Sequence, residues 1–260
     1  MNTTQKVIKT FAICLSALII LSIINGVAHL VTSAFSFNND VNINETYNSD
    51  INNIKIDVGT TNMVIKYGDT FSITAENVSK EFKIKEEGNT LVIKEKNITI
   101  FSNKKSSHTT ITIPNDLNNL SIDIGAGKLE LSDITSNNFS LNQGAGKVVI
   151  TNLISNNTTI DGGAGELHIT SSKLQNLDLD LGAGKCYYNG ILLGNNKIDQ
   201  GVGELILDLQ NDDYKFKVEK GLGSLTVNGN SYSEDFEVGE GTNIIDIDGG
   251  VGSIIINTNK

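Results

Sequence analysis

Five copies of one motif decide the fold of this chain. The first, at residues 120–131, reads LSIDIGAGKLEL, and the next four read FSLNQGAGKVVI, TTIDGGAGELHI, LDLDLGAGKCYY and NKIDQGVGELIL. Their first glycines recur every 19 residues, at Gly125, Gly144, Gly163, Gly182 and Gly201. Two further copies follow at Gly221 and Gly250, after steps of 20 and 29 residues. A repeat of constant length predicts a stack of equal coils in which each coil pairs with its neighbours.

Each copy predicts a strand, a sharp corner and a second strand. Apolar and polar residues alternate on both sides of the glycines, as in strands that bury one face. The alternation breaks across Gly-x-Gly, where a tight bend needs residues without side chains. The residue between the glycines is expected to point inward; it is alanine in the first four copies and Val202, Leu222 or Val251 in the others. The predicted structural corners are Gly125 and Gly127, Gly144 and Gly146, Gly163 and Gly165, Gly182 and Gly184, Gly201 and Gly203, Gly221 and Gly223, and Gly250 and Gly252.

The predicted fold class is therefore all-β, a parallel β-helix or β-solenoid with about 19 residues per coil. Residues 120–260 form the regular repeats, with an insertion at 229–241 that predicts a protruding loop or a small hairpin. Residues 51–119 are rich in strand patterns but irregular, which is typical of a cap that stops edge-to-edge growth. Their first part, NIKIDVGTTNMVIKY, resembles a degenerate copy of the motif with Gly59 at the bend. Residues 35–50 are polar and predict a tether.

An apolar run near the N-terminus predicts the compartment. Residues 11–30 are long enough, as a helix, to cross a bilayer core of about 30 Å. Lys6 and Lys9 precede the run and the next lysine is Lys55, which predicts a cytoplasmic stub at 1–9 and a signal-anchor helix over 10–34. The protein is then expected in the cell membrane with a single pass and an extracytoplasmic C-terminal domain. The alternative is a cleaved signal peptide that ends near Ala28 or Ala34.

Composition excludes some classes of partner. The 260 residues carry 20 basic and 30 acidic side chains, a net charge of −10, and every basic residue is lysine. An acidic chain without arginine is a poor partner for nucleic acid. Its two cysteines, Cys14 in the apolar run and Cys186 at a core position, do not form a disulfide framework. No cofactor motif is recognised, because the Gly-x-Gly repeats lack the third glycine and the following helix of a dinucleotide site.

Two polar positions recur in register. Three residues after the first glycine, the charge alternates from Lys147 through Glu166 and Lys185 to Glu204, which predicts cross-coil ion pairs on a solvated face. The same position could instead form a stripe that binds sugar or cell wall. Two residues before the glycine, Asp161, Asp180 and Asp199 follow one another in consecutive coils. They are expected to accept hydrogen bonds from backbone N–H groups of the corners. Their alternative role is to bind a cation, with Ca²⁺ favoured by oxygen ligands.

The whole pattern resembles the bacterial "putative adhesin" domain family over residues 51–260. The resemblance rests on the N-terminal anchor, the lead-in that ends in ITIPNDL, the G-A-G repeats and the closing IDIDGGVGSIIIN. It implies a β-solenoid of unknown function outside the membrane, as is common in Gram-positive bacteria. It implies no catalytic residues, and some relatives are linked to envelope-stress signalling.

The function expected from these features is binding or scaffolding without catalysis, with an envelope protein or polymer as the partner. One alternative is an accessory sensor of envelope stress. Another is a polysaccharide-active enzyme that uses a carboxylate pair such as Glu166 and Glu204, whose separation of two coils suits an inverting mechanism. The absence of Trp from the sequence argues against a sugar-cleaving cleft. His108, His168 and Tyr187 are expected to be ordinary surface residues.

Overall fold

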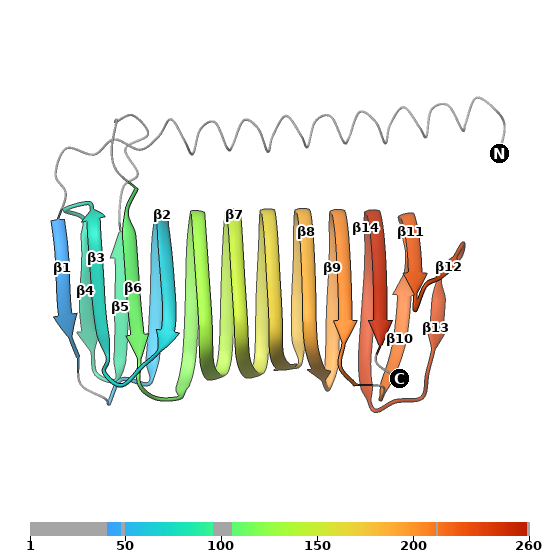
Figure 1. The fold of residues 1–260 in the computed structure, drawn as a ribbon, viewed down its shortest axis with the longest axis horizontal. Helices are drawn as coiled ribbons and strands as arrows, with labels where there is room; N and C mark the ends of the chain where they lie inside the picture. The colour runs from blue at the N-terminus through green and yellow to red at the C-terminus, as the bar shows by residue number, and fades with distance from the viewer. Residues whose placement is uncertain (1–40, 48–49, 96–105, 212, 259–260) are drawn as a thin grey trace, which may run out of the picture.

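Parallel strands stacked along one axis form an elongated rod (Figure 1). The computed structural model describes all residues except 1–40, 48–49, 96–105, 212 and 259–260. The expected stub at 1–9 and membrane helix at 10–34 lie outside the described residues. Within the described part, no helix has the length and apolar character needed to cross a membrane. The strands, in chain order, are β1 (Val41–Thr46), β2 (Asn53–Tyr67), β3 (Ser72–Val78), β4 (Phe82–Glu87), β5 (Thr90–Glu95), β6 (His108–Ile113), β7 (Leu117–Gln175), β8 (Leu177–Leu193), β9 (Asn195–Leu209), β10 (Tyr214–Glu219), β11 (Leu222–Val227), β12 (Asn230–Tyr232), β13 (Phe236–Val238) and β14 (Asn243–Thr258).

The coils repeat in register, as the motif spacing predicts. β7 winds through the first three copies of the motif, and β8 and β9 carry the next two. Ala164 lies opposite Ala183, and Ala183 lies opposite Val202, so each coil is displaced by 19 residues from the last. The all-β solenoid expected from the sequence is confirmed.

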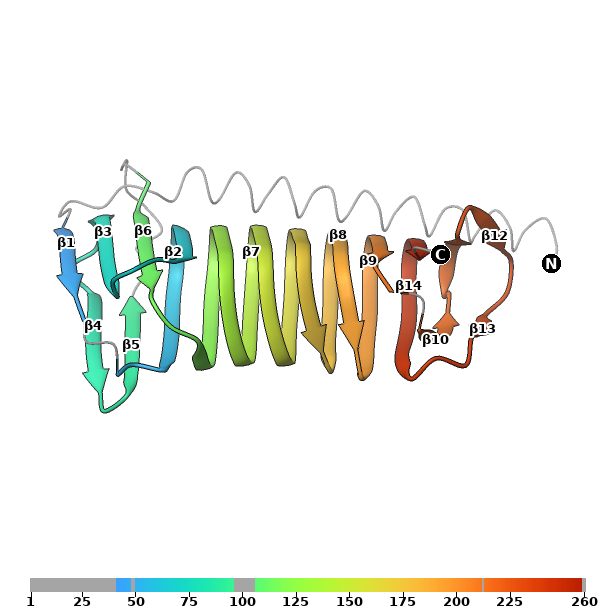
Figure 2. The same ribbon diagram turned by 60° about the horizontal axis from the view of Figure 1, so that its bottom comes forward.

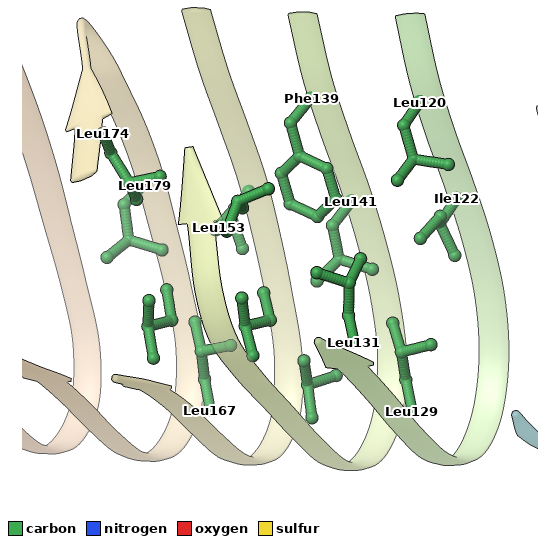
Figure 3. Close-up of a cluster of buried hydrophobic side chains, with 14 of the residues drawn as sticks. Leu120, Ile122, Leu129, Leu131, Phe139, Leu141, Leu153, Leu167, Leu174 and Leu179 are labelled. Atoms are coloured by element: carbon green, nitrogen blue, oxygen red, sulfur yellow. The ribbon is translucent and has the colours of Figure 1, made fainter. Parts of the chain in front are cut away.

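The interior of the rod is a column of apolar side chains. Leu120, Ile122 and Leu129 point into it from one coil, and Phe139 and Leu141 from the next (Figure 3). All five are at most 1% exposed, because each inward position is covered by the coils before and after it. Cys186 fills one of these positions, and burial raises the pKa of its thiol to about 12.

The Gly-x-Gly corners lie so close together that no side chain fits. A Cβ atom placed on Gly163 would lie 2.2 Å from the carbonyl oxygen of Gly144 in the previous coil. The second glycine of the corner, Gly165, has a φ of +146° and equally little space. Both sequence constraints therefore have the same origin, the close approach of one backbone to the next.

The order of the coils in space differs from their order in the sequence. β14 carries the last copy of the motif, yet it pairs in parallel with β9 on one side and with β10 and β11 on the other. Val251 thus lies between Val202 and Leu222. The coil at Gly221 forms the end of the stack, so Leu222 has no coil beyond it and is 49% exposed. The expectation that Leu222 points into the core is wrong for this reason.

The inserted segment at 229–241 covers part of that end. β12 pairs antiparallel with β11, and β13 pairs antiparallel with β10. Figure 2 shows the connection between them curving around the end of the rod. Tyr232 and Phe236 pack edge-on within it, with ring centroids 4.4 Å apart.

The N-terminal end is closed by antiparallel strands. β2 forms the first coil, with Val58 opposite Ile124 and Thr60 opposite Ala126, so Gly59 stands at the corner as the degenerate copy predicts. β5 and β6 pair in parallel with β2, and β4 and β3 then cover them in antiparallel fashion. β1 pairs with β3, so the tether expected over 35–50 is wrong for Val41–Thr46, which belongs to the sheet.

A ladder of asparagines runs along another edge of the rod. Asn138 donates to Asn119 Oδ1 at 2.9 Å and accepts from Asn157 Nδ2 at 3.0 Å. Asn119 in turn donates to Asn53 Oδ1 at 2.6 Å. Such side-chain amide ladders bond equivalent residues of successive strands and fix their register.

Candidate functional site

The predicted corner glycines have a structural role. They lie in one line, and their backbone atoms contact the corners of neighbouring coils. No ligand chemistry is required to explain them.

The acidic column is continuous over the length of the rod. Asp161 lies opposite Asp180, Asp180 opposite Asp199, and Asp199 opposite Asp248. Glu219 follows Asp248 at the end of the stack. This arrangement brings the three candidate cation ligands into one row, as the repeat predicts. Within the described residues, however, no group of His, Cys, Asp or Glu has an arrangement that could hold a metal ion.

The carboxylates of this column are paired by side chains. Lys197 Nζ lies 2.5 Å from Asp199 Oδ2 and lowers the pKa of that carboxyl. Desolvation, followed by a hydrogen bond to Asp199 and its charge, raises the pKa of Asp180. Among the hydrogen bonds of the described residues, none joins a backbone N–H to Asp161, Asp180 or Asp199. The expected corner-capping role is wrong, because the neighbouring corners bond to each other through backbone groups.

The alternating charges beside the corners do form ion pairs. Lys147 Nζ lies 2.9 Å from Glu166 Oε2, and Lys185 Nζ lies 2.6 Å from Glu204 Oε2. The hydrogen bond and charge of Lys147 lower the pKa of Glu166, with smaller contributions from His168 and Lys185. A general acid needs a raised pKa. Glu166 and Glu204 are therefore poorly prepared for the acid role of a glycosidase pair.

An outward row of apolar and aromatic side chains lies next to these ion pairs. We name it the outer stripe: Val149, His168, Tyr187, Ile206 and Ile255. His168 lies opposite Tyr187, Tyr187 opposite Ile206, and Ile206 opposite Ile255. All five are half-buried, and the rings of His168 and Tyr187 have centroids 6.1 Å apart.

Polar side chains flank the outer stripe on both edges. One flank is the row of Lys–Glu ion pairs. The other contains Thr151, Thr170, Asn189, Asp208 and Asn257, two residues further along each strand and on the same outward face. Tyr187 Oη donates to Asp208 Oδ2 at 2.8 Å, and Asn257 Nδ2 donates to Asp208 Oδ1 at 2.7 Å. The bond to Asp208 raises the pKa of Tyr187 and fixes its ring on the surface.

The outer stripe did not emerge from the sequence analysis, although its signal is present. Five residues after the first glycine, a strand position that points outward carries Val, His, Tyr or Ile in five copies. Tyr187 and His168 were considered singly, as ordinary surface residues. Only the register shows that they are neighbours in one row. His108 is exposed on β6, away from this row.

Solved structures share this fold. A "putative adhesin" from Bacteroides fragilis aligns with a TM-score of 0.57 at 17% identity, over 85% of this chain and 98% of its own. A "putative cell adhesion protein" from Clostridium sporogenes aligns with a TM-score of 0.36 at 19% identity, over 85% of this chain and 100% of its own. None of the curated proteins gives a significant match.

The family assignment rests on the sequence itself. The profile of one family matches residues 51–242, from the strand before the first corner to the end of the inserted segment. This range is most of the 260-residue chain, and it contains the repeats that form the rod. The resemblance to an adhesin-type domain family is confirmed, and the chain belongs to the Toastrack DUF4097 family.

Proposed function

We propose that this protein is a non-catalytic, adhesin-like binding module that its N-terminal segment anchors in the cell membrane, with the rod outside the cell. The outer stripe is the observation that carries the proposal. Strand positions that face water in a solenoid are ordinarily polar, and here a row of them is apolar or aromatic over consecutive coils. A continuous apolar row with polar rims is typical of an interaction surface.

The rest of the rod is consistent with a binding role. Its coils are fixed by backbone pairing, glycine corners and the asparagine ladder, so a ligand meets a surface that is already ordered. Preorganised surfaces bind with less loss of conformational entropy. The lysine partners of Glu166 and Glu204 favour the ionised carboxylates, which supports binding over acid catalysis.

Retention on envelope fractions tests the binding proposal. The full-length protein in mild detergent is mixed with sedimented cell-envelope material, and the bound fraction is measured. Ile206→Thr removes apolar surface from the outer stripe and keeps a β-branched residue, so retention is expected to fall several-fold. Ile154→Thr is the matched control, because Ile154 is also exposed, at 44%, but lies outside the outer stripe. Equal retention of the two variants would contradict the proposal.

Cell fractionation tests the anchor separately. The full-length chain is expected in the membrane pellet and accessible to protease added outside intact cells. A version lacking residues 10–34 is expected to stay in the cytoplasm. Release of the wild-type protein into the medium, beginning near residue 29 or 35, would favour a cleaved signal peptide instead.

A further inference from the structure

We propose that the outer stripe binds an uncharged glycan chain that lies along the axis of the rod. The proposal rests on the binding function above and names the chemical class of the ligand. It concerns the surface formed by Val149, His168, Tyr187, Ile206 and Ile255 with the polar flanks on either side.

The spacing of the outer stripe suits a polymer of rings. Each coil contributes one side chain, and neighbouring coils are about 4.8 Å apart, so the five rows extend over about 19 Å. A pyranose unit in an extended chain has a length close to this coil spacing. One sugar ring can therefore lie over each coil, and successive rings meet equivalent positions.

The chemistry of the surface suits a sugar. A pyranose ring has C–H faces that pack on apolar and aromatic side chains, and hydroxyl groups that project sideways from its rim. The apolar row would contact the ring faces. Hydroxyl groups at one side would reach Asn189, Asp208 and Asn257, and those at the other would reach Lys185 and Glu204. Carboxylates, amides and hydroxyls can each exchange hydrogen bonds with a hydroxyl group.

The Tyr187 ring is held in place before any ligand arrives. Its hydroxyl donates to Asp208 at 2.8 Å, and Asp208 also accepts from Asn257 in the adjacent coil. A ring fixed in this way loses little rotamer freedom on binding. Within the described surface, Tyr187 is therefore the natural stacking platform of the outer stripe.

Charge favours an uncharged polymer over an anionic one. The flank beside the outer stripe balances Lys147 and Lys185 against Glu166 and Glu204, so it presents little net charge. The chain as a whole has a net charge of −10, and the parallel acidic column adds to its negative field. A polyanion would be repelled over about 8–10 Å at physiological ionic strength.

The backbone pairing favours a glycan over an extended peptide. A peptide that binds a sheet ordinarily adds a strand to a free edge. β8 and β9, which carry Tyr187 and Ile206, are paired on both sides, so they offer no such edge. The outer stripe presents side chains alone, and their chemistry determines what binds.

Calorimetric titration of the full-length protein in mild detergent tests the proposal, with the hexamer and the dimer of β-1,4-linked N-acetylglucosamine and of β-1,4-linked glucose as probes. A hexamer is expected to bind at least tenfold more tightly than its dimer, because it spans several coils. Tyr187→Thr and Ile206→Thr are each expected to weaken hexamer binding at least tenfold. Ile154→Thr is expected to leave it unchanged, and circular dichroism checks that all three variants fold.

Other outcomes separate this inference from the binding function. If the outer-stripe variants lose retention on envelope material while neither hexamer binds, the ligand is not an uncharged glycan of this kind and the inference fails, although the binding function stands. Loss of wild-type retention after protease treatment of the envelope would identify a protein partner and would also overturn it. If Ile154→Thr weakens hexamer binding as much as Ile206→Thr, the outer stripe is not the site.

Discussion

Asp180 and Asp199 lie opposite each other in consecutive coils, and the hydrogen bond between their carboxyl groups needs a proton. The pKa of Asp180 is raised, so the folded state holds that proton more tightly than the unfolded chain does. Its contribution to stability is complete below the ordinary pKa of an aspartate and is lost as the pH rises through the raised pKa. At neutral pH, the two carboxylates repel each other.

Asp180→Asn is therefore expected to raise the melting temperature at pH 7 by about 1–3 °C and to give no gain at pH 3. Asp178→Asn is the control, since Asp178 lies opposite Lys197 and its loss brings no such relief. Thermal melts at both pH values measure the difference. An equal shift for Asp180→Asn at pH 3 and pH 7 would show that repulsion between the carboxylates is not the cause.

Two adjacent glycines provide a test of the corner. Gly163→Ala would place a Cβ 2.2 Å from the Gly144 carbonyl oxygen, so the two coils must separate, and we expect a loss of several kcal/mol in the free energy of unfolding. Gly162→Ala would find its nearest atoms at 3.5 Å, an ordinary contact distance. It is expected to be neutral or to stabilise by about 0.4–1 kcal/mol, because the unfolded chain loses freedom. Denaturant melts of both variants give the comparison, and similar midpoints would contradict it.

The asparagine ladder predicts unequal effects among asparagines. Asn138→Ala removes one hydrogen bond to Asn119 and one from Asn157. A loss of about 1–2 kcal/mol in the free energy of unfolding is expected, since each bond contributes about 0.5–1.5 kcal/mol. Asn142→Ala, an exposed position of the acidic column, is expected to change it by less than about 0.5 kcal/mol. If the two substitutions cost the same, the ladder does not contribute to stability.

Cys186 reports on the opening of the core. Burial raises the pKa of its thiol to about 12, so at pH 8 little thiolate is present and none is accessible. In a Cys14→Ser background, a thiol reagent such as dithionitrobenzoate is expected to leave the folded protein unlabelled and to react fully in denaturant. Rapid labelling of the native protein would mean that β8 opens readily.

The repeat predicts the regular part of the fold because each of its constraints is local. The alternation of residues, the Gly-x-Gly corner and the constant spacing specify strands, bend and register without reference to the rest of the chain. The ion pairs of Lys147 with Glu166 and of Lys185 with Glu204 follow directly from that register.

Features that depend on neighbours beyond one coil could not be predicted in this way. The place of β14 depends on which coil pairs better with β9, and every copy of the motif offers the same corner. The outer stripe is assembled from single residues of different coils, and each is unremarkable in its own segment. The acidic column was located correctly, but its bonding was not, since Lys197 competes with the backbone for Asp199.

The position of β14 has a consequence for how the protein is made. A chain grows from its N-terminus, so β10 and β11 leave the ribosome before the strand that must separate them from β9. Coils up to β9 can stack in the order of synthesis. The last two cannot, because early docking of β11 on β9 would occupy the place of β14. The end of the rod is therefore completed only after the final residues have been released, and its assembly is a step separate from the growth of the coils before it.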